Sequence, residues 1–227
     1  MNIVITGAGR GIGLALVQRF LQSPEHRVWA CSRDISSLQA LDSPQLFATV
    51  LDIAAASAAE ISQQVSIHFN TVDILVHNAG VLINKPFETT DLDAWRRVFE
   101  VNLFSVLKIN QALLPLLCKS HAAHIVHIGS MGGVQGSSKF PGLSAYSASK
   151  AALANLTECM AEELKSKGIH VNCLALGAVD TEMLRQAFPD YTADMSSEQM
   201  AEFIYDFSVN RRSFFNGKIL SVAASTP

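Results

Sequence analysis

Cysteine is scarce in this 227-residue sequence, and its spacing carries no metal or disulfide pattern. The chain contains four cysteines: Cys31, Cys118, Cys159 and Cys173. None belongs to a CxxC pair, so neither a thiolate metal site nor a disulfide framework is expected. His121, His124 and His127 recur every third residue, but strand neighbours three apart face opposite sides of a sheet. We therefore predict no metal.

Long apolar runs and runs of basic residues are missing as well. The longest apolar stretch, residues 103–117, is interrupted by Lys108 and Asn110, so it is not expected to span a bilayer. The chain opens directly into an apolar run at Asn2, without the charged start of a signal peptide. The net charge is −3, and no basic stripe occurs. These absences predict a cytoplasmic protein that binds neither membranes nor nucleic acid.

What is present is a mainly apolar chain of moderate length. Hydrophobic residues make up 49% of it and charged residues 16%. A domain of this size buries roughly 70–75% of its unfolded surface and needs no covalent staple. We expect one α/β domain over residues 1–227.

Short Val/Ile-rich runs alternate with longer segments of helical period. Strands are predicted at residues 2–6, 27–32, 45–51, 72–77, 124–129, 169–174 and 218–222. Helices are predicted at residues 11–22, 55–69, 91–118, 145–167 and 196–209. This alternation predicts a doubly wound, Rossmann-type, mostly parallel seven-stranded sheet with helices on both faces. Such sheets bind ligands beyond the carboxyl ends of their strands.

A glycine-rich turn separates the first predicted strand from the first predicted helix. The usual GxGxxG spacing fails, and GxxxGxG fits at Gly7, Gly11 and Gly13. Residues without a Cβ let the backbone approach a pyrophosphate at a helix N-terminus, where free N–H groups and the helix dipole favour an anion. A glycine turn without a ligand is the alternative, but the strand–turn–helix context favours a dinucleotide.

The end of the second predicted strand distinguishes NAD from NADP. An acidic residue there would accept hydrogen bonds from the adenosine ribose and repel a 2′-phosphate. Ser32 stands at that position instead, and Arg33 follows with a guanidinium suited to phosphate. Arg10 of the glycine turn can point the same way. We predict NADP(H) in preference to NAD(H), although Asp34 is adjacent and either arginine could be a solvated surface residue.

A candidate catalytic group lies in the second half of the chain. Tyr146 and Lys150 stand four apart on one face of a predicted helix. A free tyrosine has a pKa of about 10, and a nearby cation favours the phenolate and lowers that pKa. Ser130 follows a predicted strand, where its hydroxyl can hold a substrate oxygen. Each residue alone has an ordinary structural explanation, but the three together beside a glycine turn indicate an active site.

These motifs resemble those of the classical short-chain dehydrogenases/reductases over nearly the whole chain. The matching motifs, in order, are the glycine turn 6–13, Asp52, Asn78-Ala79-Gly80, Asn102, Ser130, Tyr146 with Lys150, and Gly177 with Thr181. One such motif would be weak evidence, whereas seven in order are specific.

The resemblance implies a role for each residue. Tyr146 would be the general acid of carbonyl reduction, and Ser130 would hold the substrate oxygen. Lys150 would lower the tyrosine pKa and bind the nicotinamide ribose, while Asn102 would support a proton-relay water. Asp52 would contact adenine and Thr181 the nicotinamide end. The implied cofactor-binding residues are Gly7, Arg10, Gly11, Ile12, Gly13, Ser32, Arg33, Asp52, Asn78, Ala79, Gly80, Tyr146, Lys150, Gly177, Val179 and Thr181.

Three departures from the family pattern stand out. His77 replaces the first asparagine of Asn-Asn-Ala-Gly, a structural position expected to tolerate it. Leu176 replaces the usual proline before Gly177, which is expected to loosen the adjoining loop. Ser130 and Tyr146 are sixteen apart, a few more than usual, so residues 131–142 are expected to form an unusual pocket wall.

The predicted activity is a hydride transfer of the carbonyl reductase type, between NADP(H) and a small-molecule carbonyl or alcohol substrate. The alternative is a dinucleotide-binding regulatory or signalling protein of the same fold with little turnover. Residues 131–144 and 178–195 are irregular and should wall the substrate pocket, the second as a mobile lid. The apolar excess of helices 91–118 and 145–167 predicts a homodimer or homotetramer.

Overall fold

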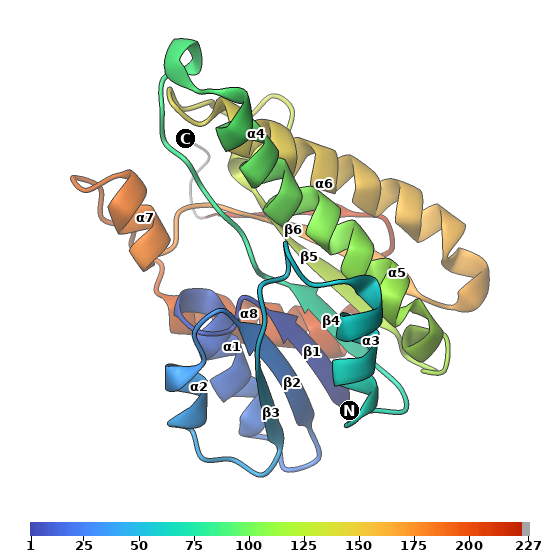
Figure 1. The fold of residues 1–227 in the computed structure, drawn as a ribbon. Coiled ribbons are helices and arrows are strands. Elements are labelled where there is room, and N and C mark those ends of the chain that lie inside the picture. The colour runs from blue at the N-terminus through green and yellow to red at the C-terminus, as the bar shows by residue number, and fades with distance from the viewer. Residues whose placement is uncertain (224–227) are drawn as a thin grey trace.

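A seven-stranded parallel sheet forms the centre of the molecule (Figure 1). The computed structural model describes residues 1–223. The strands are β1 (Asn2–Thr6), β2 (Arg27–Ser32), β3 (Leu46–Val50), β4 (Ile74–His77), β5 (His124–Ser130), β6 (His170–Leu176) and β7 (Ile219–Val222). They lie in the order β3-β2-β1-β4-β5-β6-β7, with every neighbouring pair parallel. The predicted Rossmann-type sheet is confirmed.

Helices cover both faces of this sheet (Figure 1). They are α1 (Gly11–Leu21), α2 (Ser36–Gln39), α3 (Ala58–Ser66), α4 (Leu92–Phe99), α5 (Ser105–Leu117), α6 (Ser144–Glu163), α7 (Glu182–Ala187) and α8 (Ser197–Asn210). Along β1, Ile3 and Ile5 pack beneath α1 and α8, while Val4 packs beneath α3, α5 and α6. Successive strand residues point to opposite faces, and both faces are buried, which explains the unbroken apolar runs. No helix in the described part of the chain has the length and apolar character needed to cross a bilayer.

The predicted helix 91–118 forms as one unbroken helical stretch, but a π-helical turn that was not predicted interrupts its α-helical geometry. Asp91 caps α4 by accepting a hydrogen bond from Ala94 N (2.8 Å), as an N-cap aspartate should. A π-helical turn, Glu100–Phe104, then separates α4 from α5 and contains the buried Asn102. Apolar periodicity runs through both helices and does not reveal a turn widened by one residue. Such turns occur mostly as single insertions and often at functional sites.

The segment 178–195 is also more ordered than predicted, because it contains the six-residue helix α7. Thr181 caps this helix through a hydrogen bond from Leu184 N to its hydroxyl (3.2 Å). Figure 1 shows α7 standing away from the sheet, near the loops at its carboxyl edge. Helices as short as α7 and the four-residue α2 carry too little periodicity to be recognised from sequence. The predicted mobility of the segment stays a prediction.

The predicted helix 55–69 is longer than the helix that forms. Its first residues make a turn instead, with Ala55 N and Ala56 N both donating to Asp52 O. Ser57 then caps α3 by accepting a hydrogen bond from Glu60 N (3.1 Å). The predicted helix 145–167 also ends early, because α6 stops at Glu163 and a 3₁₀ turn follows at Lys165–Lys167. The remaining predicted boundaries lie within two residues of the observed ones.

A chain of buried polar side chains crosses the core beneath α5 and α6. His77 Nε2 donates to Asn110 Oδ1 (2.8 Å), and the Asn110 amide donates to His127 Nε2 (3.3 Å). His127 Nδ1 then donates to the Thr157 hydroxyl (2.8 Å), which donates to the Leu153 carbonyl (2.8 Å). Because His127 Nε2 accepts a hydrogen bond in this arrangement, the His127 imidazole is neutral. His77, the departure from the family asparagine, is therefore built into the core.

The neighbouring His124 faces the opposite side of the sheet. Its Nδ1 donates to Ser208 O on α8 (3.0 Å), and its Nε2 accepts from Asn172 Nδ2 (3.1 Å). His124 and His127 thus diverge, as the strand spacing predicts.

These three buried histidines predict a loss of stability in acid. Burial lowers the pKa of His77 and of His124 to about 4, and that of His127 well below its usual value. The unfolded chain, with a histidine pKa of about 6.5, therefore binds more protons than the native protein below that pH. Each buried histidine should lower the free energy of unfolding by about 2 kcal/mol between about pH 7 and pH 5. Denaturant titrations across this range measure the slope.

His77→Asn should flatten that slope by about one histidine's share, because asparagine does not titrate. His121→Asn is the matched control, since His121 is exposed. An unfolding free energy that is the same at both pH values would contradict the prediction.

Candidate active site

A cavity of about 870 Å³ opens at the carboxyl ends of the strands. This size is within the range of cofactor and ligand pockets. All of the predicted site residues line it except Gly13 and Asn102, which lie behind the lining. The sheet therefore brings together one set of side chains from segments far apart in sequence.

The glycine turn is shaped by close backbone approaches. Gly7 has φ +66°, and a Cβ there would lie 2.6 Å from Ala79 Cα. A Cβ on Gly13 would lie 2.3 Å from Gly7 O, so a side chain at this position would force the turn open. Asn78 Nδ2 donates to Gly7 O (2.8 Å) and fixes the turn against the end of β4. The N-terminus of α1 thus faces the cavity across a backbone cradle that fits a phosphate group.

Two arginines line the end of the cavity beside β2. Arg33 follows β2, and Arg10 is the N-cap residue of α1. Asp34, which raised the possibility of NAD, is fully exposed, does not line the cavity, and accepts a hydrogen bond from Ser36 N (2.9 Å). That hydrogen bond holds the pKa of the Asp34 carboxyl below its usual value. The Asp34 carboxylate therefore binds the local backbone and is not part of the cavity lining.

The remaining predicted cofactor residues follow the other strand ends. Ile12 belongs to the first turn of α1, Ser32 ends β2, Asp52 follows β3, Ala79 and Gly80 follow β4, and Gly177, Val179 and Thr181 follow β6. Together with the glycine turn and the arginines they form one continuous wall of the cavity. This is the crevice that parallel α/β sheets use for ligands.

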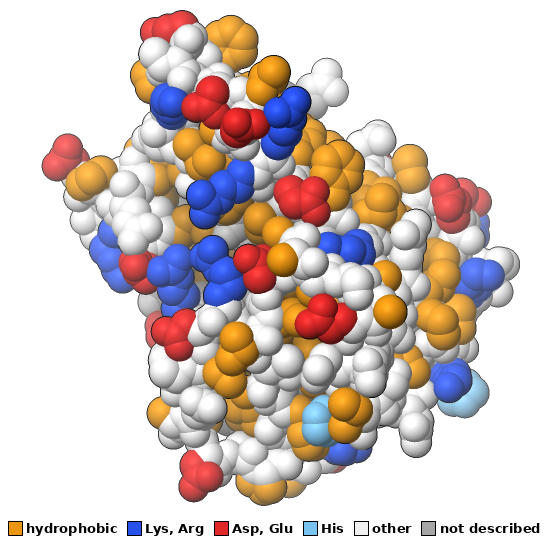
Figure 2. Space-filling model, in the orientation of Figure 1, with side chains coloured by type: hydrophobic (Ala, Val, Ile, Leu, Met, Phe, Trp, Pro, Cys, Tyr) orange, Lys and Arg blue, Asp and Glu red, His pale blue; other side chains and the backbone are white. Residues whose placement is uncertain are grey.

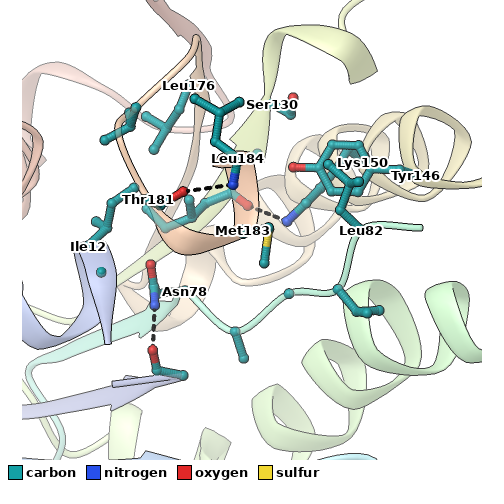
Figure 3. A pocket seen from close by; sticks show the side chains of 18 of the residues that line it. Ile12, Asn78, Leu82, Ser130, Tyr146, Lys150, Leu176, Thr181, Met183 and Leu184 are labelled. Carbon is teal, nitrogen blue, oxygen red and sulfur yellow. Dashed lines mark hydrogen bonds between the residues drawn. The ribbon is translucent and has the colours of Figure 1, made fainter. Parts of the chain in front are cut away.

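The candidate catalytic side chains meet at the other end of the cavity. Figure 3 shows Tyr146 and Lys150 extending from α6, with Ser130 at the end of β5. The Ser130 and Tyr146 side chains both line this end of the cavity. Lys150 Nζ donates to the Ile128 carbonyl (2.7 Å) and lies 5.9 Å from the centre of the Tyr146 ring. A Cβ on Gly80 would lie 3.6 Å from Lys150 Nζ, so Gly80 keeps the ammonium open to the cavity.

Burial moves both of these groups toward their neutral forms. It raises the pKa of Tyr146, and the hydrogen bond from Ser130 opposes the rise only in part. It also lowers the pKa of Lys150 to about 8. Lys150 was expected to lower the Tyr146 pKa, but that pKa is raised. The ammonium extends past the Tyr146 ring to the Ile128 carbonyl of β5 instead of pairing with the phenol oxygen. Tyr146 is a protonated phenol at neutral pH, which is the form required of an acid.

Asn102 holds the site together from behind. Its Oδ1 accepts from Val81 N (2.8 Å), and its Nδ2 donates to Val81 O (3.0 Å) and to the Ser149 hydroxyl (3.0 Å). Ser149 in turn donates to Tyr146 O (2.7 Å). Both amide hydrogens and the amide oxygen are hydrogen-bonded, so the Asn102 side chain ties the loop after β4 to the first turns of α6. The π-helical turn directs it there.

The wall around the candidate catalytic end is apolar and comes from two loops. Phe140 and Leu143 line it from the loop before α6, and Leu184 and Phe188 from the segment around α7. Phe140 and Phe188 meet edge to face with ring centres 6.1 Å apart. Residues 131–142 thus form part of the pocket wall, as expected from their unusual length.

Sequence reasoning missed several residues of this region. Leu82 lines the cavity two residues after Gly80, and Arg97 lines it from α4. Asn84 Nδ2 donates to Ala187 O (2.8 Å) and so links the loop after β4 to the end of α7. The position of Leu82 directly after Asn78-Ala79-Gly80 was a usable signal. Nothing in the local sequence marks Arg97 or Asn84.

Leu176 is packed rather than loose. It is the last residue of β6, pairs with Ser130 and Val222, and is 5% exposed. Gly177 N donates to Val222 O (2.9 Å), which fixes the start of the following segment. The loosening expected from the missing proline does not occur at residues 176 and 177 themselves.

Curated proteins of similar sequence include a reductase and a short chain dehydrogenase. The chain is 27% identical over 234 residues to the 3-oxoacyl-[acyl-carrier-protein] reductase of Salmonella typhimurium, covering 96% of this chain and 94% of that protein. It is 32% identical over 235 residues to the short chain dehydrogenase mpl6 of Monascus purpureus, covering 96% and 79%.

Solved structures share the fold over the same extent. A short chain dehydrogenase from Salmonella enterica serovar Typhi superimposes with a TM-score of 0.85 at 27% identity, covering 97% of this chain and 94% of that one. An Escherichia coli CFT073 protein described as a short chain dehydrogenase, crystallised with NADPH, gives a TM-score of 0.86 at 26% identity, covering 97% and 95%. The sequence model of the short chain dehydrogenases matches residues 1–192. With that match over most of its length, and with the parallel sheet and strand-end cavity described above, the chain belongs to the short chain dehydrogenase family of oxidoreductases.

Proposed function

We propose that this protein is an NADP(H)-dependent oxidoreductase that transfers hydride between nicotinamide and a carbonyl or alcohol carbon, as carbonyl reductases do. The observation that carries the proposal is that the hydroxyls of Ser130 and Tyr146 line the same cavity as the glycine turn and Arg33. The similarity to 3-oxoacyl-[acyl-carrier-protein] reductases and to an NADPH-bound structure supports a carbonyl substrate and this cofactor.

Each candidate catalytic residue has a defined task in the proposed reduction. A bound nicotinamide would supply the hydride. The Ser130 and Tyr146 hydroxyls would both hydrogen-bond the substrate oxygen, and Tyr146 Oη would donate the proton that the oxygen gains. Lys150 would hold the nicotinamide ribose from the position where Gly80 leaves its ammonium open. Asn102 would act as a positioning residue, since its amide is taken up by Val81 and Ser149.

The substrate end of the cavity favours an apolar carbonyl compound. Its walls are formed by aromatic and aliphatic side chains from the loops before α6 and around α7, including Phe140 and Phe188. Lys150 is the cation nearest to the reacting hydroxyls, and its ammonium is held by Ile128 O. Burying apolar surface of a substrate there would supply binding energy next to the reacting carbon.

A homodimer or homotetramer is also proposed, through the outer face of α4 and α5. Leu92 and Phe104 are 69% and 50% exposed, and Leu107 on the same helical region is 37% exposed. Apolar residues gathered on one helical region favour burial against a second copy.

The first test concerns the acid. Tyr146→Phe removes only the phenol oxygen, so kcat should fall by about 10²–10⁴-fold, the usual worth of general acid–base catalysis, while NADPH affinity stays within a few-fold. Lys150→Ala should lower kcat and weaken NADPH binding together. Stopped-flow hydride transfer and fluorescence titration measure the two effects, with substrates drawn from a panel of aldehydes, ketones and quinones.

Tyr205→Phe is the matched control, because Tyr205 lies on α8 and does not line the cavity. Near wild-type turnover in Tyr146→Phe would remove the catalytic assignment. NADPH binding without any NADPH oxidation across the panel would instead favour the regulatory or signalling protein.

The second test concerns the cofactor. Arg33→Ala should weaken NADPH binding by about 1–3 kcal/mol and barely change NADH binding, because a charge-assisted contact to the 2′-phosphate is lost. Arg96→Ala is the control, since Arg96 lies on α4 outside the cavity and pairs with Asp93. Titration of both dinucleotides decides the matter. An equal loss for NADPH and NADH would contradict the preference for NADP(H).

A further inference from the structure

The first residue of α7 is held by the glycine turn. Glu182 Oε2 accepts a hydrogen bond from Arg10 NH1 at 2.5 Å, and the two residues are 172 positions apart in the chain. Glu182 Oε1 also accepts from Gln186 Nε2 (2.8 Å), one turn further along α7. Both partners line the cavity, and their side chains are 58% and 50% exposed. The segment that walls the substrate end is thus tied to the residue that caps α1.

Arg10 is therefore shared between two anionic partners in the proposed function. On the face shown in Figure 2, Lys and Arg side chains gather on the left with Asp and Glu side chains among them. A 2′-phosphate beside Arg33 would draw on the same Arg10 guanidinium that Glu182 now holds. A phosphate dianion makes the stronger charge-assisted bond, and a carboxylate left beside it is a like charge.

NADH lacks that phosphate and would leave the pair intact. NADPH and NADH would therefore differ in their effect on the Arg10–Glu182 pair of α7 as well as in their contacts at the ribose. An ion pair between exposed side chains contributes little to stability, so it can be exchanged when a stronger anion arrives.

We infer that Glu182 is a specificity-determining residue that couples the segment around α7 to the 2′-phosphate: it opposes NADPH, is released from Arg10 when NADPH binds, and stays paired when NADH binds. The inference rests on the proposed function, because it requires a dinucleotide in this cavity. It adds an acidic residue, remote in sequence from β2, to the groups that set the cofactor preference.

Glu182→Gln tests the inference, since it keeps the shape of the side chain and removes the charge. NADPH should bind about 2- to 5-fold more tightly to this variant at low ionic strength, with the gain shrinking as salt is added, whereas NADH affinity should not change. Asp180→Asn is the matched control. It removes the other ion pair of the same segment, Asp180 with Arg185, which does not reach the glycine turn.

Amide hydrogen exchange gives an independent readout of the coupling. The amides of residues 182–187 should exchange faster in the wild-type protein saturated with NADPH than in the protein saturated with NADH. Glu182→Gln should remove that difference, because neither complex then holds the ion pair.

The outcomes separate the inference from the proposed function. Binding of both dinucleotides with no selective gain in Glu182→Gln, a loss of NADPH affinity in that variant, or an equal gain in Asp180→Asn would each overturn the inference and leave the proposed function standing. Failure of the wild-type protein to bind either dinucleotide would overturn both.

Discussion

The approach of two backbone turns at the carboxyl edge of the sheet is the constraint on which the site depends. In the order β3-β2-β1-β4, β2 and β3 lie on one side of β1 and β4 lies on the other. The connections that follow β1 and β4 therefore run in different directions and leave a crevice between them. Gly7 and Ala79 come so close that a Cβ on Gly7 would overlap the Ala79 backbone. Asn78 and the Thr6 hydroxyl, which accepts from Ala79 N (3.2 Å), lock the two turns together. The N-terminus of α1 is aimed into the crevice as a consequence.

Desolvation is the second physical theme of the site. Lys150 is 4% exposed and its ammonium has a backbone carbonyl as its partner, so burial lowers its pKa toward neutrality. The Tyr146 pKa rises for the same reason. A buried cation with open hydrogen-bonding capacity favours a polar ligand such as a ribose hydroxyl pair, and a buried phenol favours donation to an oxygen that gains charge. Low polarity around both groups therefore serves binding and chemistry together.

The sequence contained most of the fold but only part of the site. Strands were predictable because β1 and β5 are buried on both faces and read as continuous apolar runs, and Gly7, Tyr146 and Lys150 were predictable because local spacing places them. The π-helical turn at Asn102 was not, because one extra residue per turn does not disturb an apolar pattern that continues on both sides. The partner of Arg10 was not predictable either. Glu182 is 172 residues away, and only the return of the chain after β6 brings it to the glycine turn.

The predictable and the unpredictable residues of the site differ in how the fold holds them. The glycine turn, Ser130 and the residues after β4 and β6 are fixed by strands whose pairing leaves them little freedom, so the sheet holds the proposed cofactor groups and α6 holds Tyr146 and Lys150. The walls of the substrate end come from loops joined by single contacts, such as Asn84 to Ala187 and Phe140 to Phe188. Changes in those loops alter the pocket without moving a strand end. α7 belongs to both parts, because it contributes Leu184 to the wall and Glu182 to the glycine turn. In the proposed complex, a change at the cofactor's ribose would therefore reach the substrate wall through the single side chain of Glu182.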